Sequence, residues 1–141
     1  MTLATTYICV DDMGRSFEFY KMLLQLEPTF YSERWITFNC GCSLALYNKK
    51  YDLELLKSSA DGVFNKAYKE DVQRNTGDSK NNIVVLNFVT NDLNAEYERL
   101  KSLKIGEISD IMYVNVFVPY WYFNIKDPDG NVIEITGVYN I

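Results

Sequence analysis

Two segments of this chain, 80 residues apart, carry the same pattern of side chains, and this repeat limits the folds that the chain can adopt. Residues 6–10 and 84–89 are runs of mostly apolar residues, which are typical of β-strands. After each run, apolar residues recur at the spacing of one helix face. These positions are Met13, Phe17, Tyr20 and Leu24 in the first copy and Leu93, Tyr97, Leu100 and Leu103 in the second.

Residues that favour helix ends flank both predicted helices. We expect Asp11 or Asp12 to cap the first helix, because a short side-chain oxygen accepts hydrogen bonds from the first turn. The corresponding cap of the second helix is Asn91 or Asp92, and the glycine that follows that helix is predicted to end it. That glycine is Gly106.

Further strand-like runs follow each helix, so that each half of the chain is predicted to be β-α-β-β-β. One half cannot bury both its sheet face and its helix, and we therefore expect the two halves to pack together. The predicted fold class is α+β. The runs are residues 35–39 and 43–47 in the first half and residues 111–118, 121–125 and 132–136 in the second.

A charged segment joins the two halves. Residues 51–56 and 63–72 are expected to form short helices, and residues 75–82 have the composition of an exposed turn-rich linker. A connection this long is unusual in a compact domain. It is therefore either a cover over a pocket or a mobile insert. The expected boundaries are about 4–48 for the first module, 49–81 for the linker and 82–138 for the second module.

A hairpin signal closes the second half. Asp127-Pro128-Asp129-Gly130 stands between two strand-like runs. Proline presets the backbone for the second position of a type I turn, and aspartate and glycine suit the next two positions. These residues therefore predict a tight turn between two antiparallel strands.

Three segments together resemble the vicinal-oxygen-chelate superfamily, which includes glyoxalases, bleomycin-resistance proteins and extradiol dioxygenases. Residues 10–20 and 92–100 resemble its two strand-to-helix segments, and residues 127–134 resemble its closing hairpin. The resemblance covers most of the chain and implies one glyoxalase/bleomycin-resistance-type domain over residues 1–141. It also implies two paired βαβββ modules that form a curved mixed sheet around a central cavity, with the helices outside.

In metal-dependent members of this superfamily, four side chains bind a divalent metal, and these are histidines and glutamates. This chain contains no histidine. The resemblance assigns three of these positions to Thr5, Ala45 and Val85, or to Val84 if the last register shifts by one. Only the fourth, Glu134, matches the family. One carboxylate does not satisfy zinc, magnesium or manganese. We therefore expect no metal site of the family type and no cofactor.

Strand alternation predicts which other side chains face the cavity. If Thr5 and Glu134 point inward, so do Tyr7, Cys9, Ser43, Tyr47 and Asn87. Trp121 lies on a strand between two tyrosines, Tyr120 and Tyr122, where the register is open. The candidate ligand-binding residues are therefore Thr5, Tyr7, Cys9, Tyr47, Asn87, Trp121 and Glu134.

Composition excludes several partners. The net charge of −5 and pI near 4.7 argue against nucleic acid and anionic membranes, which require a basic surface. The sequence shows no secretion signal and no apolar run of membrane-spanning length, so we expect a cytoplasmic protein. Cys9 is expected to be packed in a strand, and Cys40-Gly41-Cys42 to form a tight turn rather than a metal or redox pair.

These observations predict a metal-independent protein that binds a small apolar or aromatic organic molecule. The alternative is a lyase, isomerase or dioxygenase whose metal ligands have moved or that uses Glu134 as a general base. A structural module without a pocket is a third possibility. The resemblance further implies a homodimer, and the clustered aromatic residues 120–122 agree with an interface.

Overall fold

The computed structural model describes residues 5–58, 63, 64, 69, 73, 84–115 and 119–140. The chain divides into two compact units, Met1–Ser79 and Lys80–Ile141, and each is described by itself. Three helices and two four-stranded sheets occur among the described residues. This content confirms the α+β class predicted from the sequence.

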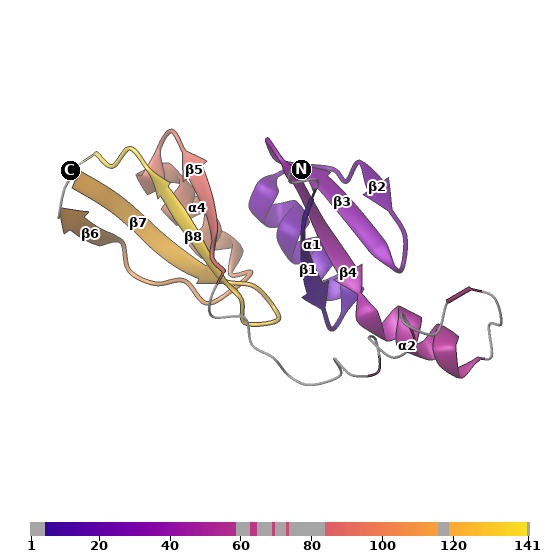
Figure 1. The fold of residues 1–141 in the computed structure, drawn as a ribbon. Helices are drawn as coiled ribbons and strands as arrows, with labels where there is room; N and C mark the ends of the chain where they lie inside the picture. The colour runs from indigo at the N-terminus through magenta and orange to yellow at the C-terminus, as the bar shows by residue number, and fades with distance from the viewer. Residues whose placement is uncertain are drawn as a thin grey trace. The chain divides into compact units, whose positions relative to one another are not determined.

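The first unit holds a mixed sheet with the strand order β1-β4-β3-β2 (Figure 1). The strands β1 and β4 are parallel, whereas β4, β3 and β2 pair in antiparallel fashion. The elements are β1 (Thr6–Val10), α1 (Met13–Leu24), β2 (Phe30–Tyr31), β3 (Trp35–Asn39), β4 (Ser43–Asn48) and α2 (Lys49–Lys57).

The second unit has the same topology, with the strand order β5-β8-β7-β6 and parallel pairing of β5 with β8. Both units therefore contain the βαβββ arrangement that the sequence predicts. The elements are β5 (Leu86–Thr90), α4 (Leu93–Leu103), β6 (Met112–Asn115), β7 (Pro119–Lys126) and β8 (Val132–Gly137).

Matching caps begin α1 and α4. The carboxylate of Asp12 accepts a hydrogen bond from Arg15 N at 2.9 Å, and the carboxylate of Asp92 accepts one from Ala95 N at 2.9 Å. The two caps are 80 residues apart, which confirms the repeat. The prediction that Gly106 ends the second helix is wrong, because α4 ends at Leu103 and Lys104 takes the left-handed conformation with φ of 53°.

Apolar residues on one face of each sheet pack against the helix of the same unit. In the first unit, the ring of Phe17 on α1 stacks on Phe38 of β3 at 6.2 Å between centroids. In the second, Tyr97 of α4 meets Phe123 of β7 at 5.2 Å. Ile36, Phe38, Leu46, Phe123, Ile125 and Ile133 are fully buried in these two cores.

Three local predictions can be compared directly with the structure. The helix expected at residues 51–56 is confirmed as α2 (Lys49–Lys57). The tight turn at Cys40-Gly41-Cys42 is also confirmed, with Gly41 at φ 93° and Cys40 N donating to Cys42 O at 3.1 Å. The short strand β2 has no counterpart among the sequence predictions. Most of the expected helix at 63–72 and all of the linker at 75–82 lie outside the described residues.

The closing hairpin is organised by the buried carboxylate of Asp127. Gly130 N donates to Asp127 O at 3.0 Å, which closes the predicted four-residue turn. The side chain of Asp127 accepts hydrogen bonds from Asp129 N at 3.0 Å, from Asn131 N at 2.8 Å and from Asn131 Nδ2 at 2.8 Å. Asp127 thus fixes the join between β7 and β8, the strand that carries Glu134.

Candidate functional site

The sheet of the first unit has one face against α1 and an opposite face, here called the first open face. Cross-strand partners in a sheet point to the same side, so the register identifies the residues of this face. Ala45 of β4 lies opposite Tyr7 and Thr37, and Tyr47 lies opposite Cys9 and Trp35. Thr5, just before β1, donates its hydroxyl to the hydroxyl of Ser43 at 3.1 Å.

Three aromatic rings gather on the first open face. The ring centroid of Tyr7 lies 5.3 Å from that of Trp35 and 6.1 Å from that of Tyr47, and the centroids of Trp35 and Tyr47 are 5.9 Å apart. We call these three residues the aromatic triad. Tyr7 is 56% exposed, and Trp35 and Tyr47 are half-buried. The triad therefore presents accessible ring surface from three neighbouring strands.

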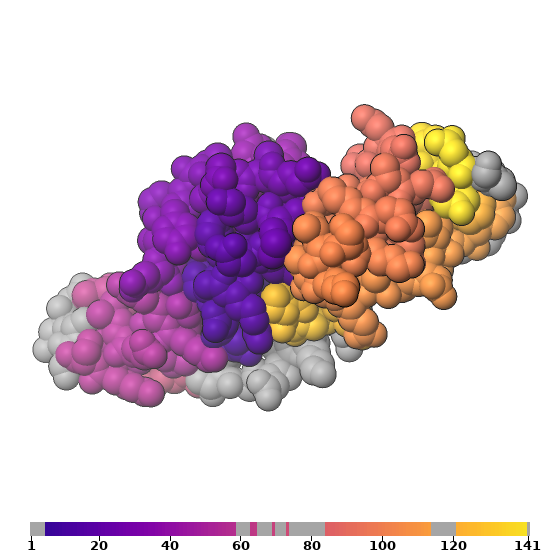
Figure 2. Space-filling view, turned by 180° about the vertical axis from the view of Figure 1, so that it is seen from behind, coloured from indigo at the N-terminus to yellow at the C-terminus, as the bar shows by residue number. Residues whose placement is uncertain are grey.

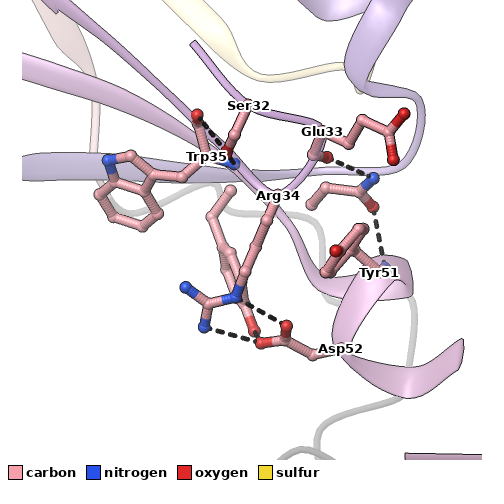
Figure 3. Close-up of polar contacts among 8 residues, drawn as sticks. Ser32, Glu33, Arg34, Trp35, Tyr51 and Asp52 are labelled. Atoms are coloured by element: carbon pink, nitrogen blue, oxygen red, sulfur yellow. Dashed lines mark hydrogen bonds and ion pairs between the residues drawn. The ribbon is translucent and has the colours of Figure 1, made fainter. Parts of the chain in front are cut away.

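A carboxylate on α2 anchors one edge of the triad. Asp52 is 0% exposed, and its oxygens Oδ1 and Oδ2 accept hydrogen bonds from Arg34 Nε at 2.7 Å and Nη2 at 2.9 Å (Figure 3). Oδ2 also accepts the hydroxyl proton of Tyr47 at 2.6 Å. The guanidinium of Arg34 in turn lies 5.4 Å from the centroid of the Tyr47 ring. Tyr47, Arg34 and Asp52 therefore form a closed network.

The start of α2 is fixed to the sheet by its cap. Asn48 accepts a hydrogen bond from Tyr51 N at 3.3 Å through its side-chain oxygen and donates through Nδ2 to Glu33 O at 3.0 Å. The magenta atoms of Figure 2 show α2 at the molecular surface. Because the cap sets where the first turn begins, Asp52 reaches the sheet while Lys50 and Glu54 remain exposed.

Cys9 lies next to Tyr47 in the register of the first open face. Although Cys9 is exposed over much of its surface, nearby protein atoms exclude enough water to raise the pKa of its thiol, and the charge of Lys49 opposes this shift. The thiol is therefore more fully protonated than an ordinary cysteine at the same pH. This environment makes Cys9 a poor nucleophile.

The second unit has its own open face, opposite α4. Glu134 of β8 stands between Asn87 of β5 and Asn124 of β7 in the register. Asn87 Nδ2 donates to Glu134 Oε1 at 2.6 Å. The side-chain oxygen of Asn124 is buried and has no hydrogen-bond partner among the residues that the structure describes. An amide–carboxylate–amide row thus crosses this face.

Trp121, whose register the sequence left open, lies on the other side of that sheet from Glu134. Trp121 pairs with Tyr113 of β6. Along β7, Tyr122 and Asn124 point to the face of Glu134, and Trp121 points to the opposite face. The centroid of its ring lies 4.4 Å from that of Tyr113 and 4.2 Å from that of Tyr139. The residue of β7 next to the polar row is therefore Tyr122.

The four positions at which the family holds its metal do not fit a metal here. The register confirms that Ala45 and Glu134 are equivalent, since Ala45 pairs with Tyr7 as Glu134 pairs with Asn87. Ala45 and Val85 offer no ligand atom, and a threonine hydroxyl ligates weakly. Within the described parts of the chain, no group of three histidine, cysteine, aspartate or glutamate side chains is placed to hold a metal ion.

The chain belongs to the glyoxalase/bleomycin resistance protein/dioxygenase superfamily, whose family model matches residues 2–135. Among solved structures, it resembles lactoylglutathione lyase from Agrobacterium tumefaciens, with a TM-score of 0.65, 18% identity and coverage of 96% of this chain and 92% of that one. It also resembles the fosfomycin resistance protein FosX from Listeria monocytogenes, with a TM-score of 0.66, 14% identity and coverage of 98% and 93%. No curated protein matches the sequence.

Sequence reasoning missed several residues of these faces. Trp35 could have been found, because the turn at Gly41 pairs residues whose numbers sum to 82, which sets Trp35 opposite Tyr47. No local pattern predicts the contact between Arg34 and Asp52, which are 18 residues apart.

Among the described residues, no helix is both long and apolar enough to cross a bilayer.

Proposed function

We propose that this protein binds a small apolar or aromatic organic molecule without the help of a metal. The observation that carries the proposal is the aromatic triad, whose three rings lie within 6.1 Å of one another on the first open face. Tyr7 leaves 56% of its surface exposed there. Aromatic surface with a few placed polar groups is typical of sites for small organic ligands.

The chemistry of the four family positions supports the metal-independent part of the proposal. Thr5, Ala45, Val85 and Glu134 together supply one carboxylate and one hydroxyl. A catalytic zinc requires about three protein ligands, and magnesium or manganese sites are built from several oxygen ligands. The carboxylate of Glu134 already accepts a hydrogen bond from Asn87. Ligand recognition through rings and hydrogen bonds suits this set of residues better.

An enzymatic function with Glu134 as a general base is the second candidate. The pair of Glu134 with Asn87 favours it, because an amide that fixes one carboxylate oxygen also orients the other toward a substrate. Such a reaction would still require a substrate that Glu134 can deprotonate. A change of Glu134→Gln separates the two candidates, since it abolishes base catalysis but retains ring contacts in the first unit.

A thermal-shift screen tests the proposal. Protein treated with a chelator is screened against neutral aromatic compounds, aromatic cations and, in parallel, divalent metals. We expect aromatic compounds to raise the melting temperature in the presence of the chelator, since a ligand that binds only the folded state stabilises the folded protein. Stabilisation by zinc, nickel, iron or manganese alone, lost in Glu134→Gln, would contradict the metal-independent proposal and support an enzyme in which Glu134 is a metal ligand.

We also propose that the protein forms a homodimer. Exposed aromatic residues, namely Phe30, Tyr31 and Tyr113, provide apolar surface on β2 and β6, which are edge strands of the two sheets. Light scattering at micromolar concentration tests this. A mass near the 16.4 kDa of one chain that does not change on concentration would contradict it.

A further inference from the structure

We infer that Asp52 is a positioning residue for the aromatic triad and controls ligand affinity without touching the ligand. This inference rests on the proposed function, because it concerns the same surface. Asp52 is not on the sheet: it belongs to α2, and its carboxylate is 0% exposed. Its effect on a ligand must therefore pass through the residues that it holds.

One hydrogen bond connects Asp52 to the triad directly, and Arg34 provides a second, indirect connection. The hydroxyl of Tyr47 donates to Oδ2 at 2.6 Å, which restricts rotation of the side chain about its Cα–Cβ bond. Arg34 donates to both carboxylate oxygens, at 2.7 and 2.9 Å, and its guanidinium lies 5.4 Å from the centroid of the Tyr47 ring. The Tyr47 ring is thus held at its hydroxyl and along one face.

The position of the Tyr47 ring also affects its two neighbours. Its centroid is 5.9 Å from that of Trp35 and 6.1 Å from that of Tyr7, with the Tyr7 ring at 84° to it. If Tyr47 rotates, Trp35 and Tyr7 lose an edge contact and the shape of the exposed surface changes. Preorganised rings bind a planar ligand more tightly because less side-chain entropy is lost on binding.

Charge at the network points to the class of ligand. The carboxylate of Asp52 neutralises the guanidinium of Arg34, so the edge of the triad nearest α2 contains a paired charge. A free charge on the ligand gains little from such a pair, since both ions already have an opposite charge. The surface therefore fits an uncharged planar aromatic group, and the neutral dye N-phenyl-1-naphthylamine is a suitable probe.

The test is a fluorescence titration of this probe against the full chain and its variants. Tyr47→Phe removes the donor of this hydrogen bond. Asp52→Asn replaces the charged carboxylate with an amide, whose single acceptor oxygen cannot hold both Tyr47 and the two nitrogens of Arg34. Both changes keep the size of the side chain. Each is expected to weaken probe binding roughly 3- to 10-fold, the range for one hydrogen bond. The double variant is expected to bind the probe as tightly as the single variant with the lower affinity, because both changes disrupt the same connection between Tyr47 and Asp52.

A matched control is available in the second unit. Glu96 on α4 forms an Arg–carboxylate fork with Arg99, with Nε to Oε2 at 2.8 Å, and its partner lies on the same helix. Glu96→Gln removes a similar ion pair without changing the triad, and its probe affinity is expected to equal that of the natural protein. Near-ultraviolet circular dichroism should change in Tyr47→Phe and Asp52→Asn, but not in Glu96→Gln.

Two outcomes would overturn the inference. If the natural protein binds the probe and the Tyr47 and Asp52 variants bind it equally well, or their effects simply add, then Asp52 does not position the triad. In that case the proposed ligand-binding function still holds. If the natural protein binds neither this probe nor any other aromatic compound, the proposed function fails and the inference fails with it.

Discussion

The hydroxyl of Tyr47 donates a 2.6 Å hydrogen bond to the buried carboxylate of Asp52, and this bond joins the first open face to the helix α2. A tyrosine on a sheet surface usually turns its hydroxyl to water. Here the hydroxyl points to a side chain that also neutralises Arg34. The ring surface that Tyr47 shares with Tyr7 and Trp35 therefore depends on a residue outside the sheet.

Tyr7→Ala is predicted to weaken binding of N-phenyl-1-naphthylamine roughly 3- to 10-fold, because ring contacts contribute about 0.5–1.5 kcal/mol each. Tyr31 is the control. It is as exposed as Tyr7, at 57% against 56%, but its ring packs at 5.1 Å from Phe17 on α1. Tyr31→Ala should leave probe affinity unchanged in the same titration. Equal losses in both variants would mean that the probe does not select the triad.

Asp127→Ala is predicted to lower the free energy of unfolding by about 2–3 kcal/mol, because a buried carboxylate that accepts three hydrogen bonds is lost. Urea denaturation measures this change. Asp110 is exposed and serves as the control, with an expected change within about 0.5 kcal/mol for Asp110→Ala. If the two variants unfold at the same urea concentration, the turn does not depend on the Asp127 side chain.

The sequence predicts the modules well because their signals are local. Acidic caps such as Asp12 and Asp92, the helix stripes and the turn at Asp127 act within a few residues. The end of α4 was mispredicted, because Lys104 adopts the left-handed conformation that glycine usually takes. Repeat spacing could not reveal this exception.

Strand alternation predicted which residues share a face only where the register was fixed. Tyr7, Cys9 and Tyr47 share a face as expected, since alternation along β1 and β4 determines it. Trp121 was placed with an open register, and the pairing of β7 with β8 puts it on the opposite face from Glu134. The contact between Arg34 and Asp52 depends on how α2 leaves the sheet, which no spacing encodes.

Asn124→Leu is predicted to raise the free energy of unfolding by about 1 kcal/mol, since it removes a buried oxygen that lacks a partner among the described residues. The contrasting variant is Asn94→Leu. The side chain of Asn94 donates to Asn140 O and accepts from Asn140 N, both at 3.1 Å, so its loss should destabilise the protein. Urea denaturation of both variants measures the difference. A destabilised Asn124→Leu would show that its amide is satisfied in solution.

Alkylation of Cys9 is predicted to require a higher pH in the folded protein than in urea. Burial raises the pKa of the thiol, so the folded state holds its proton more tightly and contains less thiolate at a given pH. By linkage, Cys9 contributes stability below the ordinary thiol pKa and loses it as pH rises through the raised value. Iodoacetamide labelling of a Cys40→Ser, Cys42→Ser variant between about pH 7 and 10 measures the shift. A lower midpoint in the folded protein would contradict it.

The central claim, that aromatic ligands bind without a metal, is tested most directly by titrating N-phenyl-1-naphthylamine into protein kept in a chelator and into protein supplied with zinc, manganese or magnesium. Thr5, Ala45, Val85 and Glu134 provide too few ligand atoms for a metal to contribute. The predicted result is saturable binding with the same affinity in every sample. Binding that appears only after a metal is added, and that disappears in Glu134→Gln, would contradict the claim.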